Sequence, residues 1–305
     1  MYKQGGIIMK SQHYSLSIED LLKINKLKSK TLLIKYGGSI MDNGSAQDAF
    51  IEDLLLLSSM GIKIVMVHGG GPEISKQLTK SGVESKFING LRVTDKETIE
   101  IVEMVLSGKV NKKLSSNLSR KGLDTIGISG TDSNLIKVQK KYLDEGGQKV
   151  DIGFVGEITN INKGILLKLI DSNIIPVISP IGSDEQGNSY NINADSAAAY
   201  ISGAINAEKL LIMTDIDGVY MDIKDPSTLL KSITIDEINQ YTESGVITGG
   251  MLPKLECCIS ALKSGTSSVH LIDGRVAHSL LSTLLHDNGT KIIYEREEKS
   301  CQKIV

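Results

Sequence analysis

The chain has 305 residues, a formal net charge of -2 and an aromatic content of 4%. This length can bury a sizeable core, either as one large α/β domain or as two lobes. A near-neutral charge with few aromatic residues does not fit the basic surface that nucleic-acid-binding proteins carry. We therefore expect no nucleic-acid partner. No apolar run reaches the roughly 20 residues of a membrane-spanning helix, so we also expect no membrane partner.

The N-terminus and the cysteines indicate the cellular location. Residues 1–10 contain one apolar triplet instead of the longer apolar stretch of a signal peptide, so we expect a cytoplasmic protein, or one in an organelle stroma if it is organelle-encoded. Three cysteines, of which Cys257 and Cys258 are adjacent, match neither a disulfide framework nor a metal site. We interpret the cysteines as small core or surface residues.

Residues 17–27 predict a short amphipathic helix. Ser17 is a suitable N-cap, and Ile18, Leu21 and Leu22 share one helical face. A helix of this length is unstable in isolation, so its apolar face must pack on another surface. That surface is either the rest of its own domain or a partner subunit, and these residues favour neither.

The first apolar strand, at residues 31–39, contains a lysine and ends in glycines. Lys35 lies near the carboxyl end of this strand, where its charge is costly unless it meets an opposite charge. Gly37 and Gly38 follow directly, so the lysine and a flexible turn would lie side by side. A strand-end lysine that only reaches solvent is the alternative.

Residues 62–74 read as a buried strand, a glycine turn and a helix. Gly69, Gly70 and Gly71 let the backbone approach a ligand without a Cβ in the way. Pro72 suits the first turn of a helix, whose unpaired N–H groups attract anions. An anion site is therefore one hypothesis for this turn, and a plain tight connection is the other.

The middle and the end of the chain alternate between strand and helix patterns. A loop at residues 87–95 carries Arg92, whose guanidinium suits a carboxylate. The other predicted elements are strands at residues 125–128, 135–138, 154–158, 174–178, 267–272 and 290–293, and helices at residues 98–118 and 163–172. This alternation predicts a parallel sheet with helices on both faces, and ligands in such a sheet bind beyond the carboxyl ends of the strands.

Three further polar turns contain candidate site residues. Asp195 lies where a polar turn runs into an alanine-rich helix, and it is either a cap or first-turn carboxylate or part of a catalytic scaffold. Residues 209–220 repeat the strand-then-turn pattern around Asp215. Residues 249–255 begin another helix with Lys254 in the first turn, where a lysine opposes the helix dipole and a bound anion would explain it.

Together these segments resemble the amino acid kinase family, and within it the N-acetylglutamate kinases. The motifs are Lys-Tyr-Gly-Gly at 35–38, His-Gly-Gly-Gly-Pro at 68–72, Asn-Gly-Leu-Arg-Val-Thr at 89–94, Gly-Lys-Val-Asn-Lys at 108–112, Asn-Ile-Asn-Ala-Asp at 191–195, Thr-Asp-Ile-Asp-Gly at 214–218 and Gly-Met-Leu-Pro-Lys at 250–254. The lysine and glycine motifs are shared with aspartate, glutamate, carbamate and uridylate kinases. The chain departs from its relatives at Thr131, where they usually carry lysine.

The resemblance implies a three-layer αβα sandwich around a mainly parallel open sheet. Residues 1–30 would form an N-terminal extension, residues 31–190 a lobe for the acyl amino acid and residues 191–305 a lobe for ATP. The implied reaction is phosphorylation of the γ-carboxylate of N-acetyl-L-glutamate by ATP with Mg²⁺, the second step of arginine biosynthesis. A kinase of another acyl amino acid, such as an aminoadipate derivative, and a non-catalytic amino-acid sensor on the same fold are the alternatives.

The resemblance also implies roles for individual residues. Lys35 and Lys254 would neutralise the transferred phosphoryl group from opposite sides, and Asp195 would orient both lysines. Arg92 and Asn191 would hold the α-carboxylate of the substrate. The implied substrate-binding residues are Gly69, Gly70, Arg92 and Asn191, the implied ATP-binding residues are Gly37, Gly38, Asp215 and Met251, and no side chain is implied as a metal ligand. The glycines would donate backbone N–H bonds to the reacting groups.

Other nucleotide-binding folds fit the sequence less well. A Rossmann oxidoreductase requires Gly-x-Gly-x-x-Gly after its first strand, and neither glycine turn has that spacing. A P-loop kinase requires Gly-x-x-x-x-Gly-Lys-Ser/Thr, which is absent from the sequence. A non-catalytic sensor would lack one of the lysines or Asp195, and all are present.

The resemblance further implies a homodimer or homohexamer with arginine as a possible effector. Arginine-inhibited members carry an N-terminal helix that links dimers into a ring and a C-terminal segment that binds arginine. Residues 18–27 and 272–281 resemble this inhibited class. Ser282 and Thr283 depart from it, because they replace an apolar-acidic pair, and the loop at residues 286–290 is short. We expect a hexamer with weakened arginine inhibition.

Overall fold

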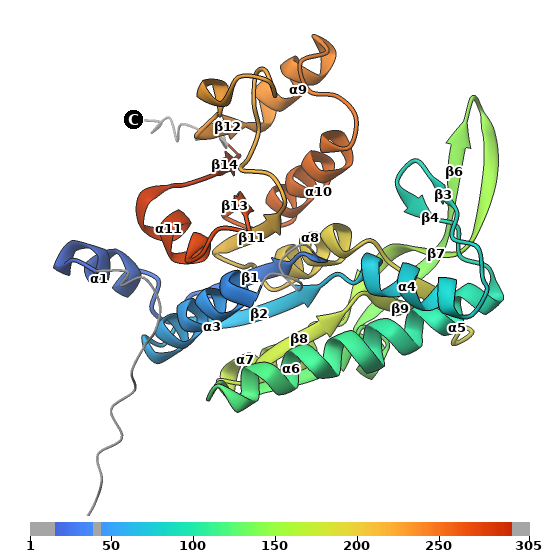
Figure 1. Ribbon diagram of the computed structural model, residues 1–305, viewed down its shortest axis with the longest axis horizontal. Helices are drawn as coiled ribbons and strands as arrows, with labels where there is room; N and C mark the ends of the chain where they lie inside the picture. Colours follow the sequence, from blue (N-terminus) through green and yellow to red (C-terminus); the bar gives the residue numbers. More distant parts are fainter. Residues whose placement is uncertain (1–15, 39–43, 295–305) are drawn as a thin grey trace, which may run out of the picture.

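The structure, a computed structural model, describes residues 16–38 and 44–294. Its centre is an eight-stranded sheet with the strand order β12-β14-β13-β11-β1-β2-β8-β5 (Figure 1). These strands are β1 (Thr31–Tyr36), β2 (Lys63–His68), β5 (Thr125–Ser129), β8 (Ile175–Ser179), β11 (Lys209–Thr214), β12 (Ser232–Thr234), β13 (Ser268–Asp273) and β14 (Thr290–Ile293). Neighbouring strands are parallel except for β13 and β14, so the predicted mainly parallel sheet is confirmed.

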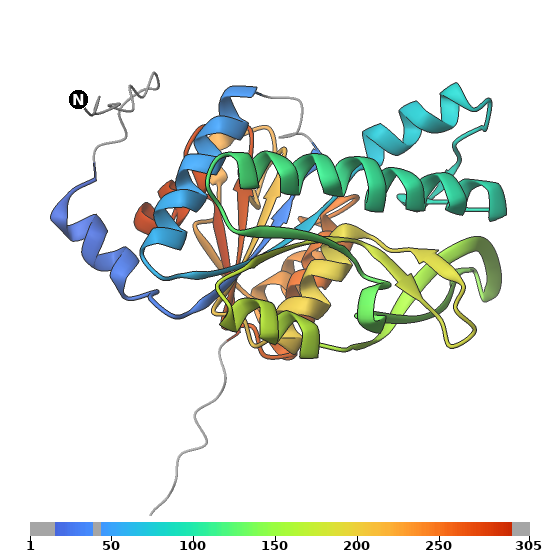
Figure 2. The ribbon, with the colours of Figure 1, turned by 90° about the horizontal axis from the view of Figure 1, so that it is seen from below.

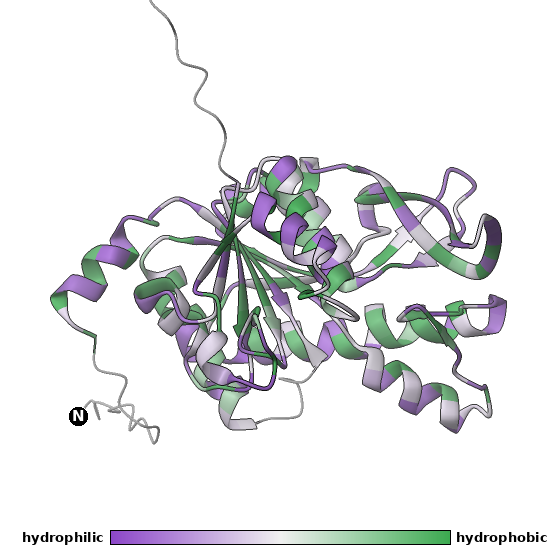
Figure 3. Ribbon diagram, turned by 90° about the horizontal axis from the view of Figure 1, so that it is seen from above, coloured by the Kyte–Doolittle hydropathy of each residue, from purple (hydrophilic) through white to green (hydrophobic). Residues whose placement is uncertain are grey.

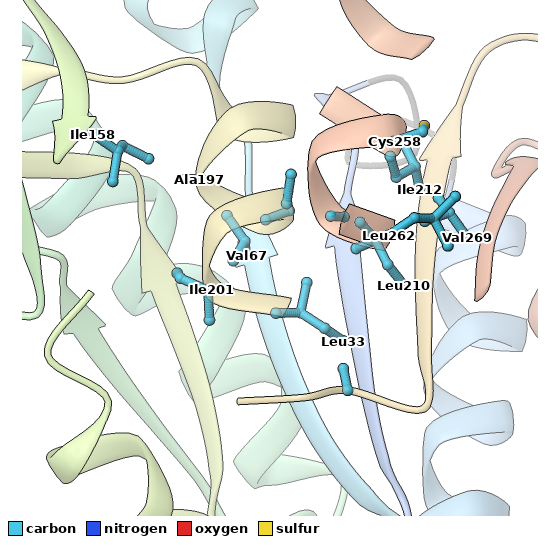
Figure 4. Packing of buried hydrophobic residues seen from close by; sticks show 14 of the residues in the cluster. Leu33, Val67, Ile158, Ala197, Ile201, Leu210, Ile212, Cys258, Leu262 and Val269 are labelled. Atoms are coloured by element: carbon cyan, nitrogen blue, oxygen red, sulfur yellow. The ribbon is translucent and has the colours of Figure 1, made fainter. Parts of the chain in front are cut away.

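One face of the sheet packs against helices from the second half of the chain. Successive side chains of a strand point to opposite faces, and Leu33, Val67 and Leu210 all belong to the core on this face. Ala197, Ile201 and other apolar residues of the covering helices fill the space above these strands (Figure 4). The helices on this face are α7 (Gly164–Asp171), α8 (Ala194–Ala204), α9 (Ile235–Glu243) and α10 (Met251–Lys263).

The opposite face has its own apolar core, formed by the alternate residues of the same strands. Leu32, Ile34 and Met66 are fully buried there. The helices on this face are α3 (Gly44–Ser59), α6 (Asn111–Arg120) and α11 (Ser279–His286). Figure 3 shows the strands as a mostly hydrophobic layer between helices of mixed polarity. The expected three-layer αβα arrangement is thus confirmed.

A long helical rod crosses this second face (Figure 2). We predicted one helix at residues 98–118, and the rod contains three segments, α5 (Lys96–Glu103), the π-helix η1 (Met104–Val110) and α6. The π-helix and α4 (Gly71–Lys80) enclose a small apolar cluster that includes Leu78 and Leu106. The rod therefore changes its hydrogen-bond register beside the glycine turn that follows β2.

The predicted strands at residues 135–138 and 154–158 do not join the central sheet, which corrects one part of the predicted topology. They belong to a long antiparallel hairpin of β6 (Ile136–Glu145) and β7 (Gln148–Ile161). With β9 (Ile181–Ser183) and β10 (Ser189–Asn191) the hairpin forms a small closed barrel. The outer half of the hairpin is largely solvent-exposed, so its residues do not show the apolar pattern of a buried strand.

Residues 87–95, which we expected to form a loop, contain a short hairpin. Its strands are β3 (Phe87–Ile88) and β4 (Leu91–Arg92). Asn89 and Gly90 form the turn with φ values of 48° and 77°. An Asn-Gly pair with positive φ at both residues is the preferred two-residue hairpin turn. The sequence therefore contained the signal for this hairpin, and the expectation of a loop was wrong.

The predicted N-terminal helix is present as α1 (Ile18–Asn25). Ser17 accepts a hydrogen bond from the Asp20 backbone N–H, and the Asp20 side chain accepts one from the Ser17 backbone N–H, which completes a capping box. Two short 3-10 turns occur at Asp132–Asn134 and Pro226–Thr228. No helix within the described ranges has both the length and the hydrophobicity needed to cross a membrane.

Candidate active site

The predicted glycine turns meet at the carboxyl edge of the central sheet. β1 and β2 are adjacent, and Tyr36 pairs with His68 at their carboxyl ends. Gly69 donates a backbone hydrogen bond of 3.0 Å to the Tyr36 carbonyl. A Cβ on Gly38 would lie 3.3 Å from Cδ of Pro72 in the neighbouring turn. The two turns therefore form one compact surface of exposed backbone, as the parallel sheet predicts.

Three charged side chains converge beside this surface. Lys35 Nζ lies 2.9 Å from Oδ1 of Asp195, and Lys254 Nζ lies 2.5 Å from Oδ2 of the same carboxylate. The three side chains are only 12%, 13% and 15% exposed for Lys35, Asp195 and Lys254 respectively. The residues come from β1, α8 and α10, so elements far apart in the sequence bring them together.

The Asp195 carboxylate stays ionised because two ammonium groups surround it. Burial alone would raise the pKa of Asp195, but the charges of Lys35 and Lys254 and their contacts with the carboxylate lower it to about 2. Asp195 lies in the first turn of α8, and Asn193 is the N-cap, since its side chain accepts from the backbone N–H groups of Asp195 and Ser196. We predicted that Asp195 could be a cap or a first-turn residue of this helix, and the structure shows that it is a first-turn residue.

Arg92 is buried, and hydroxyl and carbonyl groups hold its guanidinium. Nη1 donates to the Ser85 hydroxyl, while Nη2 lies 2.8 Å from the Ser75 hydroxyl and 3.2 Å from the Gly71 carbonyl. The Phe87 ring lies 4.6 Å below the guanidinium carbon. Burial lowers the pKa of Arg92, but a guanidinium remains charged at neutral pH. Within the described ranges no carboxylate pairs with Arg92, so its positive charge is available to an anionic ligand.

Two adjoining cavities lie at this edge of the sheet. The smaller has a volume of about 180 Å³, and its lining includes Gly69, Gly70, Arg92 and Asn191. The larger has a volume of about 800 Å³ and reaches Asp195 and Lys254. The residues common to both linings are Gly90, Leu91, Val155 and Asn193. The structure thus has a small cavity lined by the Arg92 guanidinium and a large cavity lined by Lys254 and Asp195.

The lining of the larger cavity includes residues for which we predicted no role. Lys141 and Leu143 come from the β6–β7 hairpin, and Tyr200 comes from α8. Cys257 also lines this cavity, and its Sγ lies 3.4 Å from the Ser196 hydroxyl. Tyr200 and Cys257 lie close to Asp195 and Lys254 in the sequence, and this was their only signal. Lys141 and Leu143 had no signal, because the hairpin that carries them was predicted only in part.

Four predicted ATP-binding residues lie outside both cavity linings. They are Gly37, Gly38, Asp215 and Met251. Asp215 is exposed at the carboxyl end of β11, the strand next to β1. Met251 is the first residue of α10, three positions before Lys254. These residues therefore lie along the same sheet edge or at the start of α10. None of the hydrogen bonds and ion pairs of the described residues joins them to Lys35, Asp195 or Lys254.

Thr131 takes part in a hydroxyl cluster instead of providing a charge. Its Oγ1 donates to the Ser129 hydroxyl at 3.0 Å. The Ser107 hydroxyl of the π-helix lies 3.2 Å from that of Ser129 and 2.9 Å from that of Ser179. Thr131 and these three serines thus form one cluster of neutral hydroxyl groups next to the π-helix.

Comparison with known proteins places the chain among the kinases. The model of the amino acid kinase family matches residues 30–273. A protein named acetylglutamate kinase from Clostridium acetobutylicum is 51% identical over 289 residues, which cover 94% of this chain and 98% of that protein. A protein of the same name from Methanococcus maripaludis is 48% identical over 284 residues, which cover 92% of this chain and 97% of that protein.

Solved structures show the same fold. An N-acetylglutamate synthase from Neisseria gonorrhoeae, complexed with coenzyme A and N-acetyl-glutamate, gives a TM-score of 0.78 at 24% identity. The match covers 91% of this chain and 62% of that chain, so this chain spans less than two thirds of the synthase. A Giardia lamblia carbamate kinase bound to AMP-PNP gives a TM-score of 0.64 at 17% identity and covers 88% of this chain and 99% of that chain. With its family motifs, its relatives and this fold, the chain belongs to the amino acid kinase family.

Proposed function

We propose that this chain transfers the γ-phosphoryl group of ATP to the γ-carboxylate of N-acetyl-L-glutamate, the second step of arginine biosynthesis. The observation that carries the proposal is the contact of Lys35 and Lys254 with the Asp195 carboxylate. Relatives named acetylglutamate kinase, at 48% to 51% identity over most of the chain, support the choice of substrate. We place this reaction in the cytoplasm, or in an organelle stroma if the protein is organelle-encoded.

The main difficulty of this reaction is charge repulsion. A carboxylate must approach a polyanionic phosphate, so catalysis consists mostly of positioning and neutralisation. Lys35 and Lys254 enter from β1 and α10, and they place two positive charges on either side of one carboxylate. Asp195 holds both ammonium groups at a fixed spacing, and each lysine has further donors for phosphoryl oxygens. The charges that meet the transferred group are thus in place before the substrates bind.

The smaller cavity fits the acyl amino acid. The guanidinium of Arg92 supplies a paired donor for the α-carboxylate, and hydroxyl groups already hold it in a fixed orientation. Asn191 lines the same cavity, with its side-chain amide 3.5 Å from the Thr94 hydroxyl. Gly69 and Gly70 also line this cavity, but the Gly69 N–H already donates to the Tyr36 carbonyl. The expectation that both glycines donate to the reacting groups is therefore corrected, and we assign that role to the Gly70 N–H. Most of this lining comes from residues 31–190, which supports their assignment to the acyl amino acid, while Asn191 and the next three residues belong to the other predicted lobe.

We assign ATP to residues 191–305. Lys254 and the glycines at the start of α10 line the larger cavity, whose size of about 800 Å³ is within the usual range for a nucleotide-sized ligand. Asp215 and Met251 lie nearby at the sheet edge and at the start of α10, where we expect the nucleotide to extend. Gly37 and Gly38 lie at the end of β1 and are the expected donors to its phosphates.

We expect Mg²⁺ to arrive on the nucleotide phosphates. Within the described ranges no group of three or more His, Cys, Asp or Glu side chains could hold a metal ion. Asp195 is occupied by the two lysines, so it does not provide a free carboxylate ligand. Mg²⁺ commonly retains several waters and binds substrate phosphates, which a site without a protein cage permits. The ion would neutralise phosphate charge during transfer.

The oligomeric state and the effector belong to the same proposal. α1 contacts α11 through Lys23, which donates to the Leu285 carbonyl, while Ile18 and Leu22 on α1 remain 79% and 59% exposed. This apolar face suits a partner subunit and supports the homohexamer expected from the sequence. Thr283, buried and bonded to the Asn288 carbonyl, stands where an acidic residue would hold an arginine guanidinium. We therefore expect weakened inhibition by arginine.

A comparison of kcat/KM values among candidate substrates tests the proposed function. The assay measures ADP formation with N-acetyl-L-glutamate, N-acetyl-L-aminoadipate, glutamate, aspartate and carbamate under the same conditions. We expect N-acetyl-L-glutamate to have the highest kcat/KM. A higher kcat/KM for the aminoadipate derivative would identify a kinase of a longer acyl amino acid. No turnover of any substrate, together with tight binding of one of them, would indicate a sensor instead of an enzyme.

A further inference from the structure

A buried histidine and a buried asparagine lie behind the glycine turn and have no part in the proposed mechanism. His68 is the last residue of β2, and its Nδ1 lies 2.7 Å from the Gly69 carbonyl oxygen. The other ring nitrogen, Nε2, lies 3.1 Å from Nδ2 of Asn111. Both residues are fully buried. Asn111 is the first residue of α6, so it directly follows the π-helix.

Two backbone carbonyls determine where the protons of this pair lie. Asn111 Nδ2 is 2.8 Å from the Val177 carbonyl and 3.3 Å from the Ile128 carbonyl. This atom must be the amide nitrogen, because an oxygen there would face two acceptors. The two N–H groups of Asn111 are shared among these carbonyls and His68 Nε2, and Nε2 must be unprotonated because it faces a donor. The ring proton therefore lies on Nδ1, which donates to the Gly69 carbonyl. Burial lowers the pKa of His68 to about 4, which keeps the ring neutral at pH 7 as this pattern requires.

The hydrogen bond from His68 fixes the plane of the peptide between Gly69 and Gly70. Every described peptide bond is trans, so the C=O of Gly69 and the N–H of Gly70 point in opposite directions. The carbonyl points to the buried ring, and the N–H therefore points away from it. Within the described ranges no residue accepts a hydrogen bond from this N–H. Gly70 lines the smaller cavity with Arg92 and Asn191, so a ligand there can accept it.

The π-helix η1 also contacts the turn at Gly69 and Gly70. A Cβ on Gly70 would lie 2.5 Å from Cδ2 of Leu106, so the helix packs directly on the glycine backbone. The backbone N–H of Asn111 bonds to the Leu106 carbonyl in the wide π register. The π-helix therefore packs on Gly70 through Leu106. Asn111, the residue directly after the π-helix, contacts His68.

We infer that His68 and Asn111 are positioning residues that direct the Gly70 N–H toward the reacting groups of the kinase reaction. This inference rests on the proposed function. The pair does not touch the substrates; it acts through the Gly69–Gly70 peptide. A preorganised backbone donor matters most when charge develops during transfer, so the pair should affect kcat more than substrate binding.

Two substitutions at His68 separate hydrogen bonding from packing. His68→Asn keeps a side-chain N–H donor about where Nδ1 lies, whereas His68→Leu fills similar space without a donor. We expect His68→Leu to lower kcat about tenfold to hundredfold, with the KM values for acetylglutamate and ATP changed less than about threefold, because a small misplacement of a catalytic donor has effects of that order. His68→Asn should keep kcat within about threefold of wild type. Equal losses in the two variants, or no loss in either, would overturn the inference.

Nitrogen NMR of the wild-type protein provides a test that needs no variant. The ¹⁵N shifts of His68 at about pH 7 should show a protonated Nδ1 and an unprotonated Nε2. A proton on Nε2, or on both nitrogens, would contradict the inference even if His68→Leu failed to fold. The wild-type assay with acetylglutamate keeps the two proposals apart. An inactive wild type would refute the proposed function, whereas an active wild type with an unaffected His68→Leu variant would refute only the positioning role.

Discussion

Asp195 shares its two oxygens between two lysines, and this sharing determines what each lysine can do when a phosphate arrives. The carboxylate neutralises one of the two positive charges, so Lys35, Asp195 and Lys254 carry one net positive charge together. The depressed pKa of Asp195, about 2, preserves this balance across the neutral range. The stabilising contribution of its ionised form is present above the unfolded-state pKa and is lost only as the pH falls through about 2.

Lys254→Ala tests the role of the second lysine. We expect kcat to fall about 10² to 10³-fold, the usual effect of removing one donor to developing charge, while the KM for acetylglutamate changes little. Steady-state kinetics with both substrates measures this split. Lys263→Ala, which removes an exposed lysine from the last turn of the same helix, is the matched control and should leave kcat unchanged. A near-wild-type kcat for Lys254→Ala would exclude Lys254 from the site.

Arg92→Lys tests the assignment of the smaller cavity. Lysine retains the charge, but it cannot reproduce the planar contacts with Ser75, Ser85 and a carboxylate at once. We expect the KM for acetylglutamate to rise about tenfold or more, because a hydrogen bond to a charged group contributes about 1.5 to 3 kcal/mol. Isothermal titration with each substrate separates the effects. A loss of ATP affinity with unchanged acetylglutamate affinity would reverse the assignment.

Individual residues could be predicted from the sequence where their local setting was unusual. Lys35 stood out as a charge inside an apolar strand, and Lys254 as a positive charge at a helix N-terminus. The distances that join both to Asp195 could not be predicted, because they depend on how β1, α8 and α10 pack. The hydroxyl groups around Arg92 were unpredictable for the same reason, since Ser75 lies on α4 and Ser85 precedes the β3–β4 hairpin.

At the scale of elements, a pair of a partly buried histidine and a buried aspartate joins α3 to α11. His278 Nδ1 lies 2.6 Å from Oδ1 of Asp53, and the Leu281 backbone N–H lies 3.3 Å from Oδ2. Burial raises the pKa of Asp53 to about 6 although these hydrogen bonds oppose the shift. A raised folded-state pKa means that the folded protein binds this proton more tightly than the unfolded chain does. The associated stability is present at low pH and is lost as the pH rises through about 6.

Asp53→Asn should reduce this pH dependence. Asparagine cannot ionise, so we expect the variant to lose about 1 kcal/mol less unfolding free energy than the wild type between about pH 5 and about pH 7.5. Urea unfolding at the two pH values measures the difference, and His278 is present in both proteins. Asp48→Asn, at an exposed position on the same helix, is the control. The same pH dependence in Asp53→Asn and wild type would show that the buried carboxyl titrates normally.

Elements were predictable where one face of a strand or helix is buried throughout. The central strands other than β12 and the helix α1 have clear apolar patterns, and their predicted positions agree with the structure within a few residues. No strand was predicted at the three-residue β12. The β6–β7 hairpin was predicted only in part because its outer residues are solvent-exposed and need no apolar alternation. The π-helix was not predicted because it differs from an α-helix in hydrogen-bond register and not in composition.

At the scale of the whole molecule, the fold followed from the order of strands and turns, but subunit association did not. Parallel strands must place their carboxyl ends together, so the position of the site follows once the sheet is predicted. The apolar face of α1 indicates that a partner could cover it, yet a single sequence contains no information on how many copies assemble. The two lobes, the hexamer and the response to arginine therefore stay predictions.

Leu22→Glu tests the role of α1 in assembly. Leu22 is 59% exposed, so the substitution should leave the monomer fold intact while it places a charge on the proposed interface. We expect a change in solution mass from a hexamer to a dimer, measured by light scattering. Ile223→Glu, at a 71% exposed residue away from α1, is the charge-matched control. A wild-type dimer, or a hexamer that tolerates Leu22→Glu, would contradict the assembly. Tight inhibition by arginine in the same samples would contradict the weakened effector site.

The π-helix makes the spacing between the turn at Gly70 and the long rod sensitive to chain length. A π-helix bonds each N–H to the carbonyl five residues before it, so Met104–Val110 holds one residue more than an α-helix would over the same rotation. Deleting one residue from this segment would let it form an α-helix, so α5 and α6 would keep nearly the same relative rotation while the segment beside Gly70 changes shape. The packing of α6 on the sheet would then survive, but the contact of Leu106 with the catalytic turn would be lost.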